Sequence, residues 1–473
     1  MAVSYLHGVE TLQLDIQGQT ISVVKSSVVA ILGIAPLGAK NAITLCNSSA
    51  DDAQFGAPNT GFNIPKTLSI IRQIAGGCPV LVVNVFDATI NLTAIAAEAQ
   101  TVANGALKLN FEPIGGVSVL DSSGVTTTYI PGIDFKIDAY GRFTVLSTAI
   151  SNGTVLKFNY KKLNAASVTA AQFIGGIDAI TGIRSGSFLF DTAFNLFGFN
   201  PKIFISPTFS TMSGVATVLG TMAAKFRGVY AIDAPAGTTV SGALAGRGPA
   251  GIINFNTSDT RAILLFPQQT CYDIATNTNA NYPFSAFYAA AMVVNDNKNG
   301  YWVSPSNKAI LGLTGSEINI SANLSDASSE ANTLNAAGIT TVFNSFATGI
   351  KVWGNRNASY PTSTSAKNFI NVQRTDDIVS ESIELAALNF VDLGITSAFI
   401  DLIREAGNNF ISTLIQRGAL MPGSKIIYNP DDNSASELAN GHIVFERIYM
   451  VPTPAERITF QSVLDITLLQ SLK

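Results

Sequence analysis

The chain contains few of the residues on which metal, redox and acid–base sites depend. Its 473 residues include three cysteines, Cys46, Cys78 and Cys271, and two histidines, His7 and His442. No two cysteines form a CxxC pair, which argues against a disulfide framework and against a zinc site. We predict no metal site, no cofactor and a reducing compartment for folding, and we interpret both histidines as surface or interface residues.

Charged residues are scarce as well, and their balance is slightly acidic. They make up 13% of the chain, against about 25% in a typical globular protein. The net charge of -4 argues against a nucleic-acid-binding protein, which would carry a basic face. Much of the surface must be neutral, which indicates extensive self-association. A monomer rich in Gly, Ala, Asn and Thr is the alternative.

Long hydrophobic runs and targeting signals are missing. No window reaches the roughly 18 uninterrupted apolar residues of a membrane-spanning helix. Residues 1–8 have neither the basic region nor the apolar core of a signal peptide. We therefore expect synthesis in the cytoplasm without classical export, and no insertion into a membrane.

Catalytic signatures are absent too, since no P-loop, HExxH or GxSxG sequence occurs. Gly246, Gly248 and Gly251 match the pattern GxGxxG, but a short helical pattern precedes them and Pro249 lies inside. A dinucleotide-binding loop follows a strand directly, so we interpret these glycines as an ordinary loop. No set of residues supplies a nucleophile, a base and an orienting group, and we predict no catalytic or cofactor-binding residue and no enzyme activity.

What the chain does contain is an alternation of apolar strands and helices. Strand-like runs lie at Ser27–Ala35 and Pro79–Phe86, and Pro65–Ala75 between them has proline in its first turn, as many helices do. The alternation resumes after residue 166, with strands at Phe199–Ser206, Gly228–Asp233 and Arg261–Phe266 and helices at Val215–Phe226, Val240–Ala245 and Phe284–Val294. This order predicts a mostly parallel, covered sheet, and hence an α/β fold that is α+β overall.

Residues 92–163 interrupt this order. Short strand-like segments are separated by Gly132, Gly141 and Gly153, as in a small antiparallel β module. The predicted strands are Thr126–Ile130, Phe135–Ile137, Phe143–Leu146 and Val155–Tyr160. Because an inserted module must return the chain near the point where it left, we expect the two borders to lie close together.

The two longest helical patterns, Phe369–Phe390 and Ser397–Gln416, lie near the C-terminus. Strand-like segments at Lys425–Tyr428 and Ile443–Val451 follow them. With the strand expected at the C-terminus, these segments close the chain.

Both ends of the chain have the period-two alternation of a β-strand. The apolar positions are Ile458, Phe460, Leu464, Ile466 and Leu468 near the C-terminus, and Leu12, Leu14 and Ile16 near the N-terminus, where Gly18 ends the run. An apolar edge strand is normally protected by charge, proline or a covering element, and neither end has such protection. We hypothesise that both terminal strands pair with other copies of the chain.

A collinear set of motifs resembles the contractile tail sheath proteins of myophages and R-type pyocins. The set comprises Tyr5–Thr11, Val24–Pro36, Ala53–Gly56, Gly198–Ser206 and Gly300–Leu313. Within it, Gly198–Lys202 is similar to the family's GF.PKI strand and Ser304–Asn307 to its Ser-Pro-x-Asn segment. The resemblance covers nearly the whole chain except residues 92–163, a region that shorter sheaths lack.

The resemblance implies a structural subunit that polymerises helically, as stacked rings, around a tail tube and contracts to drive the tube through a target cell envelope. The implied partners are other copies of the chain, the tail tube protein, and the baseplate and tail terminator proteins, with no direct contact to nucleic acid. The implied location is the tail of a virion or of a pyocin-like particle, after synthesis in the cytoplasm of the bacterial host. In this family the terminal arms cross to neighbouring subunits and complete a sheet in the neighbour's C-terminal region.

The resemblance also implies a division of the chain. The expected parts are an N-terminal linker arm (1–26), the first part of a core domain (27–91), an inserted β domain on the outer surface (92–163), an α/β middle domain (164–368), an inner domain next to the tube (369–451) and a C-terminal linker arm (452–473). Gly18, Pro452 and Pro454 are hinge candidates or else ordinary strand terminators. Asp377, Glu381 and Glu384 share a helical face and are candidates for the tube-facing surface, with a solvated face as the alternative.

Two other functions are compatible with the residue pattern. An α/β enzyme would bind a nucleotide at a point where the strand order of its sheet reverses. Another phage structural protein, such as a capsid or baseplate component, would share this composition but form shells or discs.

Overall fold

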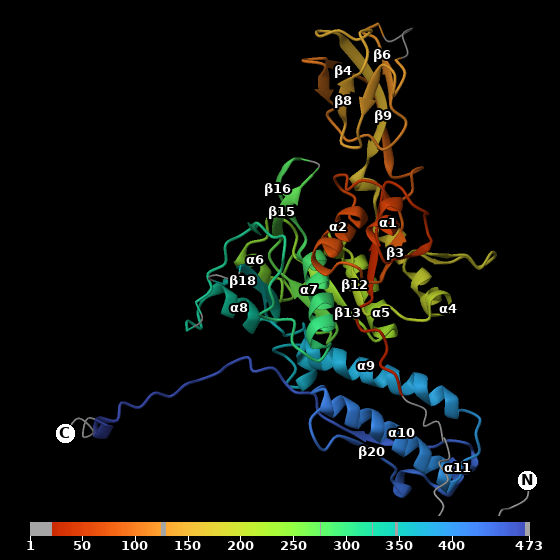
Figure 1. Ribbon diagram of the computed structural model, residues 1–473, viewed down its shortest axis with the longest axis vertical. Coiled ribbons are helices and arrows are strands. Elements are labelled where there is room, and N and C mark those ends of the chain that lie inside the picture. The colour runs from red at the N-terminus through yellow and green to blue at the C-terminus, as the bar shows by residue number, and fades with distance from the viewer. Residues whose placement is uncertain (1–20, 124–128, 275, 324, 346–348, 469–473) are drawn as a thin grey trace, which may run out of the picture. The chain divides into compact units, whose positions relative to one another are not determined.

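The computed structural model of the protein describes residues 21–468 except 124–128, 275, 324 and 346–348. The chain divides into two compact units (Figure 1). Unit 1 comprises Met1–Val24 and Ile378–Pro452, and unit 2 comprises Lys25–Asp377 and Thr453–Lys473. The division falls inside helix α9 (Ile370–Ala387), nine residues after the boundary that the resemblance implied.

Unit 2 is built around an eight-stranded sheet with the order β19-β18-β14-β13-β12-β1-β3-β2. Its strands are β1 (Val29–Gly33), β2 (Ile43–Cys46), β3 (Val80–Asn84), β12 (Ile203–Ile205), β13 (Val229–Asp233), β14 (Ala262–Leu265), β18 (Ile339–Ser345) and β19 (Gly349–Trp353). All neighbours from β18 to β3 run parallel, whereas the edge strands β2 and β19 are antiparallel to their partners. The prediction of a mostly parallel sheet is confirmed.

Helices cover both faces of this sheet. They are α1 (Ser49–Asp52), α2 (Ile64–Ala75), α3 (Ala170–Ile174), α4 (Ala193–Phe197), α5 (Ser213–Lys225), α6 (Val240–Ala245), α7 (Phe284–Asn299) and α8 (Glu330–Ala336). Two further small sheets belong to unit 2: β10 (Gly176–Ile177) with β11 (Arg184–Ser185), and β15 (Gln269–Asp273) with β16 (Thr278–Tyr282) and β17 (Gly315–Ser316). The edge strands β2 and β19 and both small sheets were absent from the sequence-based prediction.

Alternate side chains of each central strand enter two separate cores. In β1, Val29 and Ile31 contribute to the core that contains α2 and α7, whereas Ala30 and Leu32 contribute to the core that contains α5. Because both faces are covered, the central strands are apolar at every position. This is why short apolar runs were sufficient to predict them.

The inserted β module enters and leaves through one strand pair. Leu92 of β4 (Leu92–Thr101) pairs with Leu163 of β9 (Val155–Leu163), so the two ends of the insertion are neighbours. The other strands are β5 (Ala106–Lys108), β6 (Ser118–Leu120), β7 (Phe135–Ile137) and β8 (Arg142–Val145), arranged in sheets β4-β9-β6 and β5-β8-β7. Residues 126–128 of the predicted strand Thr126–Ile130 lie outside the described residues, and Ile130 belongs to no strand.

The described part of unit 1 is small and mostly helical. It contains the end of α9, α10 (Ser397–Gln416), α11 (Ala435–Ala439) and a two-stranded sheet of β20 (Lys425–Ile427) and β21 (Glu446–Ile448). Helix α10 begins where Thr396 Oγ1 accepts a hydrogen bond from the Phe399 backbone at 3.1 Å. Its bounds are those predicted from its apolar spacing.

A buried ion pair joins α7 to the start of α9 inside unit 2. Arg374 donates to both carboxylate oxygens of Asp296, at 2.8 and 2.5 Å, and the two side chains are only 3% and 0% exposed. Ser27 donates to the same carboxylate at 3.1 Å, and Arg374 also donates to the Ser26 carbonyl at 3.2 Å. The pair thus connects two helices to the segment that leads into β1.

Replacing Asp296 by asparagine should destabilise the subunit strongly. The change leaves the Arg374 guanidinium buried without a counter-charge, which costs about 3–5 kcal/mol of the free energy of unfolding. Urea unfolding followed by circular dichroism measures the loss. Asp401→Asn is the matched control, because Asp401 and Arg404 form an exposed pair on α10 that contributes no more than about 0.5 kcal/mol. Equal stability of the two variants would contradict this account.

Asp233, at the C-terminal end of β13, is a buried carboxylate without a basic partner among the described residues. It accepts hydrogen bonds from the Ser285 backbone at 2.8 Å, from Ser285 Oγ at 2.5 Å and from Ser210 Oγ at 3.1 Å. Burial raises the pKa of Asp233 from 3.8 to about 6, and the serine hydrogen bonds oppose part of this rise. The pKa of Asp233 is thus higher in the folded than in the unfolded state. The free energy of unfolding therefore falls as the pH rises from about 4 to about 6 and Asp233 ionises.

Replacing Asp233 by asparagine should remove this penalty. The difference in free energy of unfolding between variant and wild type should move in the variant's favour by about 2–3 kcal/mol from pH 4 to pH 7. Urea unfolding at pH intervals across this range gives the difference, with Glu405→Gln on the exposed side of α10 as the control. A difference that stays constant over this range would refute the assignment of the penalty to Asp233.

Candidate assembly interface

The C-terminal arm, defined as residues 453–468, exposes large apolar side chains along its length. The exposed fractions are 69% for Ile458, 89% for Phe460, 101% for Leu464, 78% for Ile466 and 71% for Leu468. The described arm contains no strand and ends in one short helical turn. A contiguous apolar surface of this kind marks an interaction site in a folded protein. The apolar side chains of the alternating pattern are therefore accessible to a partner.

The arm is attached to unit 2 at Glu456. The Glu456 carboxylate accepts hydrogen bonds from Arg356 Nε at 3.1 and 3.0 Å and from its Nη2 at 2.5 Å. Arg356 is itself held over the rings of Phe369 and Tyr360, with its guanidinium carbon 3.6 and 4.4 Å from the ring centroids. Further along the described arm, Asp465 accepts hydrogen bonds from the backbone and hydroxyl of Thr467 and from the Leu468 backbone, which form one local turn.

The stretch between Val451 and Glu456 links the two units. Val451 is buried, and the carbonyl of Met450 accepts a hydrogen bond from the Met421 backbone at 2.8 Å within unit 1. The hinge candidates Pro452 and Pro454 lie in this stretch, on either side of the division between units. The third candidate, Gly18, lies outside the described residues, as do Leu12, Leu14 and Ile16.

Unit 1 contains a short sheet that a further strand would extend on one side only. Lys425, Ile426 and Ile427 of β20 pair with Ile448, Arg447 and Glu446 of β21. On the other side of β20, Asn408 of α10 accepts from the Ile426 N–H at 2.8 Å and donates to its carbonyl at 2.9 Å. These bonds use the outward-facing backbone groups at the centre of β20. A strand added to this sheet would therefore lie on the β21 side.

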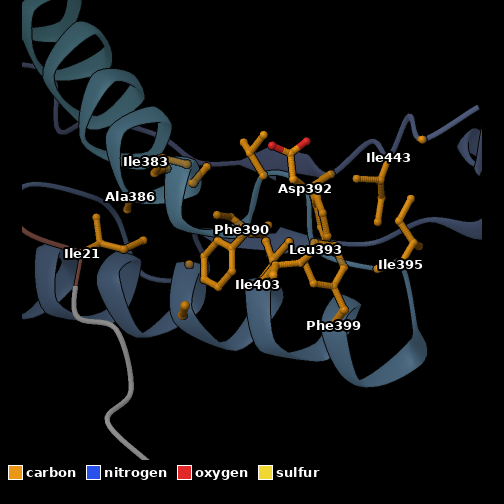
Figure 2. A pocket seen from close by; sticks show the side chains of 18 residues that line it. Ile21, Ile383, Ala386, Phe390, Asp392, Leu393, Ile395, Phe399, Ile403 and Ile443 are labelled. Carbon is orange, nitrogen blue, oxygen red and sulfur yellow. The ribbon is translucent and has the colours of Figure 1, made fainter.

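An apolar groove with a volume of about 590 Å³ lies beside this sheet (Figure 2). Asp392 provides the one charged side chain among its described lining residues. The apolar lining includes Ile383, Phe390, Leu393, Phe399, Ile403 and Ile443. The groove is thus an apolar concavity next to a sheet that can accept another strand.

Helix α10 forms one wall of the groove because its apolar residues recur at helical spacing. Phe399, Ile403 and Ala406 lie one turn apart and line the groove together. Phe390, from the segment that connects α9 to α10, packs edge-on against Phe399 with ring centroids 6.3 Å apart. Gly407 allows the sheet to approach the helix, since a Cβ at this position would lie 2.5 Å from Ile426 Cδ1.

The predicted acidic face of α9 is corrected by the structure. Asp377 is buried and forms a bidentate ion pair with Arg261 inside unit 2, and Glu381 is also buried. The carboxylate of Asp377 is therefore engaged inside the subunit, although the helical spacing of the three residues was correct. Glu384 is exposed, and a contact between Glu384 and a tube stays a prediction.

The described residues offer little for catalysis or metal binding. They contain no group of His, Cys, Asp and Glu arranged to hold a metal ion, and none of their helices is both long and apolar enough to cross a membrane. Gly246–Gly251 forms turns after α6 and follows no strand. His442 is exposed, with Nδ1 2.8 Å from the Glu437 carboxylate, and His7 lies outside the described residues.

The groove was not predicted from the sequence. The groove is lined by several segments that are distant from one another along the chain, so no local sequence pattern predicts it. One sequence feature does indicate an apolar site: Val391, Leu393 and Ile395, which flank Gly394, extend the apolar pattern beyond the end of α9. The prediction extended this helix to Phe390, whereas the structure ends α9 at Ala387.

Comparisons with known proteins agree with an assembly role. The family model for the phage tail sheath protein central domain matches residues 178–358. The tail sheath protein of Burkholderia phage BcepMu is 40% identical over 478 residues, which cover 100% of this chain and 99% of that protein. A putative prophage major tail sheath protein of Pseudomonas aeruginosa strain UCBPP-PA14 is 30% identical over 62% of this chain and 72% of its own length.

Solved structures share the fold at lower identity. The sheath complex of the PVC extracellular contractile injection system, in its contracted state, has a TM-score of 0.61 and 14% identity, covering 99% of this chain and 100% of that chain. The contracted helical sheath of the anti-feeding prophage has a TM-score of 0.59 and 15% identity, covering 98% and 100%. The identity of 40% along the whole length shows the family: the chain belongs to the phage tail sheath proteins and is a structural subunit of a contractile tail sheath.

Proposed function

We propose that copies of this chain polymerise helically around a tail tube through their terminal arms, and that contraction of this polymer drives the tube through a target cell envelope. The observation that carries the proposal is the C-terminal arm, whose apolar side chains are 69–101% exposed in the single subunit. Burying each such side chain in a neighbour stabilises the assembly by about 1.5–3 kcal/mol. The further partners in this proposal are the tube protein, the baseplate and the tail terminator.

The acceptor for the arm is the sheet and groove of unit 1 in a neighbouring copy. An arriving strand would continue the β20–β21 sheet on the β21 side, where main-chain hydrogen bonds provide pairing. One face of the strand would then place Phe460 and Leu464 in or next to the apolar groove. The N-terminal arm, with Leu12, Leu14 and Ile16 on one face, would join the same kind of sheet.

An arm that enters a different copy makes the contact head-to-tail. A head-to-tail contact whose rotation does not close on itself generates an open helix instead of a ring of fixed size. Helical growth therefore follows from the separation of arm and acceptor on one chain. The inserted module at residues 92–163 is placed on the outer surface in this proposal, because an insertion there leaves the arm contacts undisturbed.

Contraction requires two packings of one folded subunit, with rigid-body movement between them. The arm contacts persist through this movement, and bending takes place in the stretch that contains Pro452 and Pro454. The extended sheath is metastable in this scheme, and the contracted sheath has the lower free energy. Glu384 is the remaining α9 candidate for a contact with the tube.

Charge introduced on the apolar face of the arm should abolish assembly. The double variant Phe460→Asp/Leu464→Asp would bury two unpaired carboxylates, each at a cost of several kcal/mol. Both positions are solvent-exposed in the subunit, so the variant should fold normally and remain small. Sedimentation and negative-stain electron microscopy of full-length protein detect the loss of tubes, and deletion of residues 456–473 should give the same result.

The matched control is Thr459→Asp/Gln461→Asp, which places the same two charges on the opposite face of the same strand. This variant should form tubes at a critical concentration close to that of the wild type. Tubes from Phe460→Asp/Leu464→Asp, or equal loss of tubes in both variants, would refute the proposed orientation of the arm.

Filling the groove should block the acceptor while leaving the arm intact. In Ala406→Trp, the indole occupies the groove between Phe399 and Ile403 and excludes a neighbour's side chains. Glu405→Trp, on the exposed side of the same helix, is the control and should form tubes. Circular dichroism verifies that both variants fold.

Mixing the two defective variants tests the pairing directly. Ala406→Trp retains an intact arm and Phe460→Asp/Leu464→Asp retains an intact groove, so one contact can form between them but a chain cannot grow. Analytical ultracentrifugation should detect complexes of two chains and no tubes. Long tubes from the mixture, or no complex at all, would contradict the assignment of the groove as acceptor.

A further inference from the structure

A short hairpin of unit 2 carries three exposed isoleucines at its tip. Ile177, Ile180 and Ile183 are 49%, 95% and 65% exposed, and they lie in or between β10 and β11. In Figure 1 this hairpin is the yellow segment that projects from unit 2 near α4. The hairpin is separate from both arms.

Hydrogen bonds hold the tip of the hairpin in one conformation. Asp178 Oδ1 accepts from the backbone of Ile180 at 3.0 Å and of Thr181 at 2.7 Å, and from Thr181 Oγ1 at 2.8 Å. The Gly182 N–H donates to the Asp178 carbonyl, and the Asp178 N–H donates to the Ile183 carbonyl. The isoleucines are thus presented on a rigid tip, which lowers the entropy cost of binding.

Two glycines allow the hairpin to leave the body of unit 2 as a tight pair of strands. Gly175 has a φ of +65°, and a Cβ there would lie 2.0 Å from the Ser185 carbonyl oxygen. Gly186, directly after β11, has a φ of +58°. Ser187 donates to the Ile174 carbonyl at 2.9 Å and closes the base. The sequence therefore specifies the conformation at the base of the projecting hairpin.

A cavity elsewhere in unit 2 has an apolar lining and a charge opposite to that of Asp178 at the hairpin tip. It has a volume of about 420 Å³ and lies between the C-terminal ends of α2 and α7 and residues 308–311. Ile74, Val294 and Leu311 provide apolar lining, and Lys298 and Lys308 provide positive charge. Neither lysine forms an ion pair with a described residue. We name this cavity the α2–α7 pocket.

The charge of the hairpin tip complements that of the pocket. The hydrogen bonds from Thr181, followed by that from Ile180, lower the pKa of Asp178, so its carboxylate is ionised at neutral pH. The tip thus combines apolar side chains with a negative charge, and the pocket combines apolar side chains with positive charges. Complementary charge of this kind favours one partner and one orientation over others.

The hairpin and the pocket lie on opposite sides of the main sheet. Phe173 and Phe190, next to the base of the hairpin, belong to the core on the α5 side. Ile74 of the pocket packs against the core on the other side, together with α2 and α7. A projection on one side and a matching pocket on the other give a head-to-tail contact between copies that can repeat without closing.

We propose that the β10–β11 hairpin of one copy inserts its isoleucine tip into the α2–α7 pocket of the next copy, as a second contact of the sheath beside the arms. The inference rests on the proposed assembly of copies into tubes. In this contact Ile180 fills the apolar part of the pocket, and Asp178 lies near Lys298 and Lys308.

The test compares two isoleucines that are matched in exposure. Ile180→Asp should raise the critical concentration for tube formation at least about tenfold, which corresponds to about 1.4 kcal/mol per contact. Ile252→Asp, at a position of unit 2 that is 97% exposed, should leave the critical concentration within about twofold of the wild-type value. Tubes at wild-type concentrations from Ile180→Asp would overturn the proposal and leave the arm contact standing.

Cysteine crosslinking identifies the receptor and does not depend on tube yield. The three native cysteines are buried, so a short bismaleimide should react with Ile180→Cys and Leu311→Cys. A mixture of these two variants at high concentration should give crosslinked dimers, and the double variant should give ladders. Either single variant alone should give none. Dimers from Ile180→Cys alone, or an absence of crosslinks in the mixture, would overturn the proposed pocket.

Discussion

An extended apolar segment that its own subunit leaves uncovered is the constraint on which the proposed assembly depends. The arm is bound at Glu456 by an arginine that Phe369 and Tyr360 hold in place, and the apolar residues follow this attachment. Main-chain pairing gives an added strand its direction, and apolar burial gives it free energy. In the proposed assembly, the arm is covered only when a neighbouring copy supplies a sheet edge and a groove.

The packing of unit 2 favours movement as a rigid body. Its parallel sheet is buried on both faces, and the Arg374–Asp296 pair fixes α7, α9 and the segment before β1 in one arrangement. Breaking such a pair costs far more than bending an exposed proline-containing stretch. A change between two packings of the sheath would therefore be concentrated outside the core, in segments such as residues 452–455.

Sequence patterns predicted the elements whose environment is uniform along their length. Strands buried on both faces appeared as apolar runs, and α10 appeared with its correct bounds because its apolar face has helical spacing. Prediction failed where partners come from elsewhere in the chain. Asp377 is removed from the surface by Arg261, 116 residues away, and the groove is assembled from separate segments. The strand β4 was missed because its alternation is carried mainly by alanine and polar residues.

The two proposed contacts differ in how they respond to movement between copies. A strand added to a sheet is held by repeated main-chain hydrogen bonds and follows a hinged displacement of its subunit. A rigid tip in a pocket tolerates little displacement, since the dispersion gained by Ile180 falls steeply when a gap of even 1 Å opens. The arms would therefore keep copies connected in both packings. The hairpin contact would favour one packing over the other and contribute to the free-energy difference between the extended and contracted sheath.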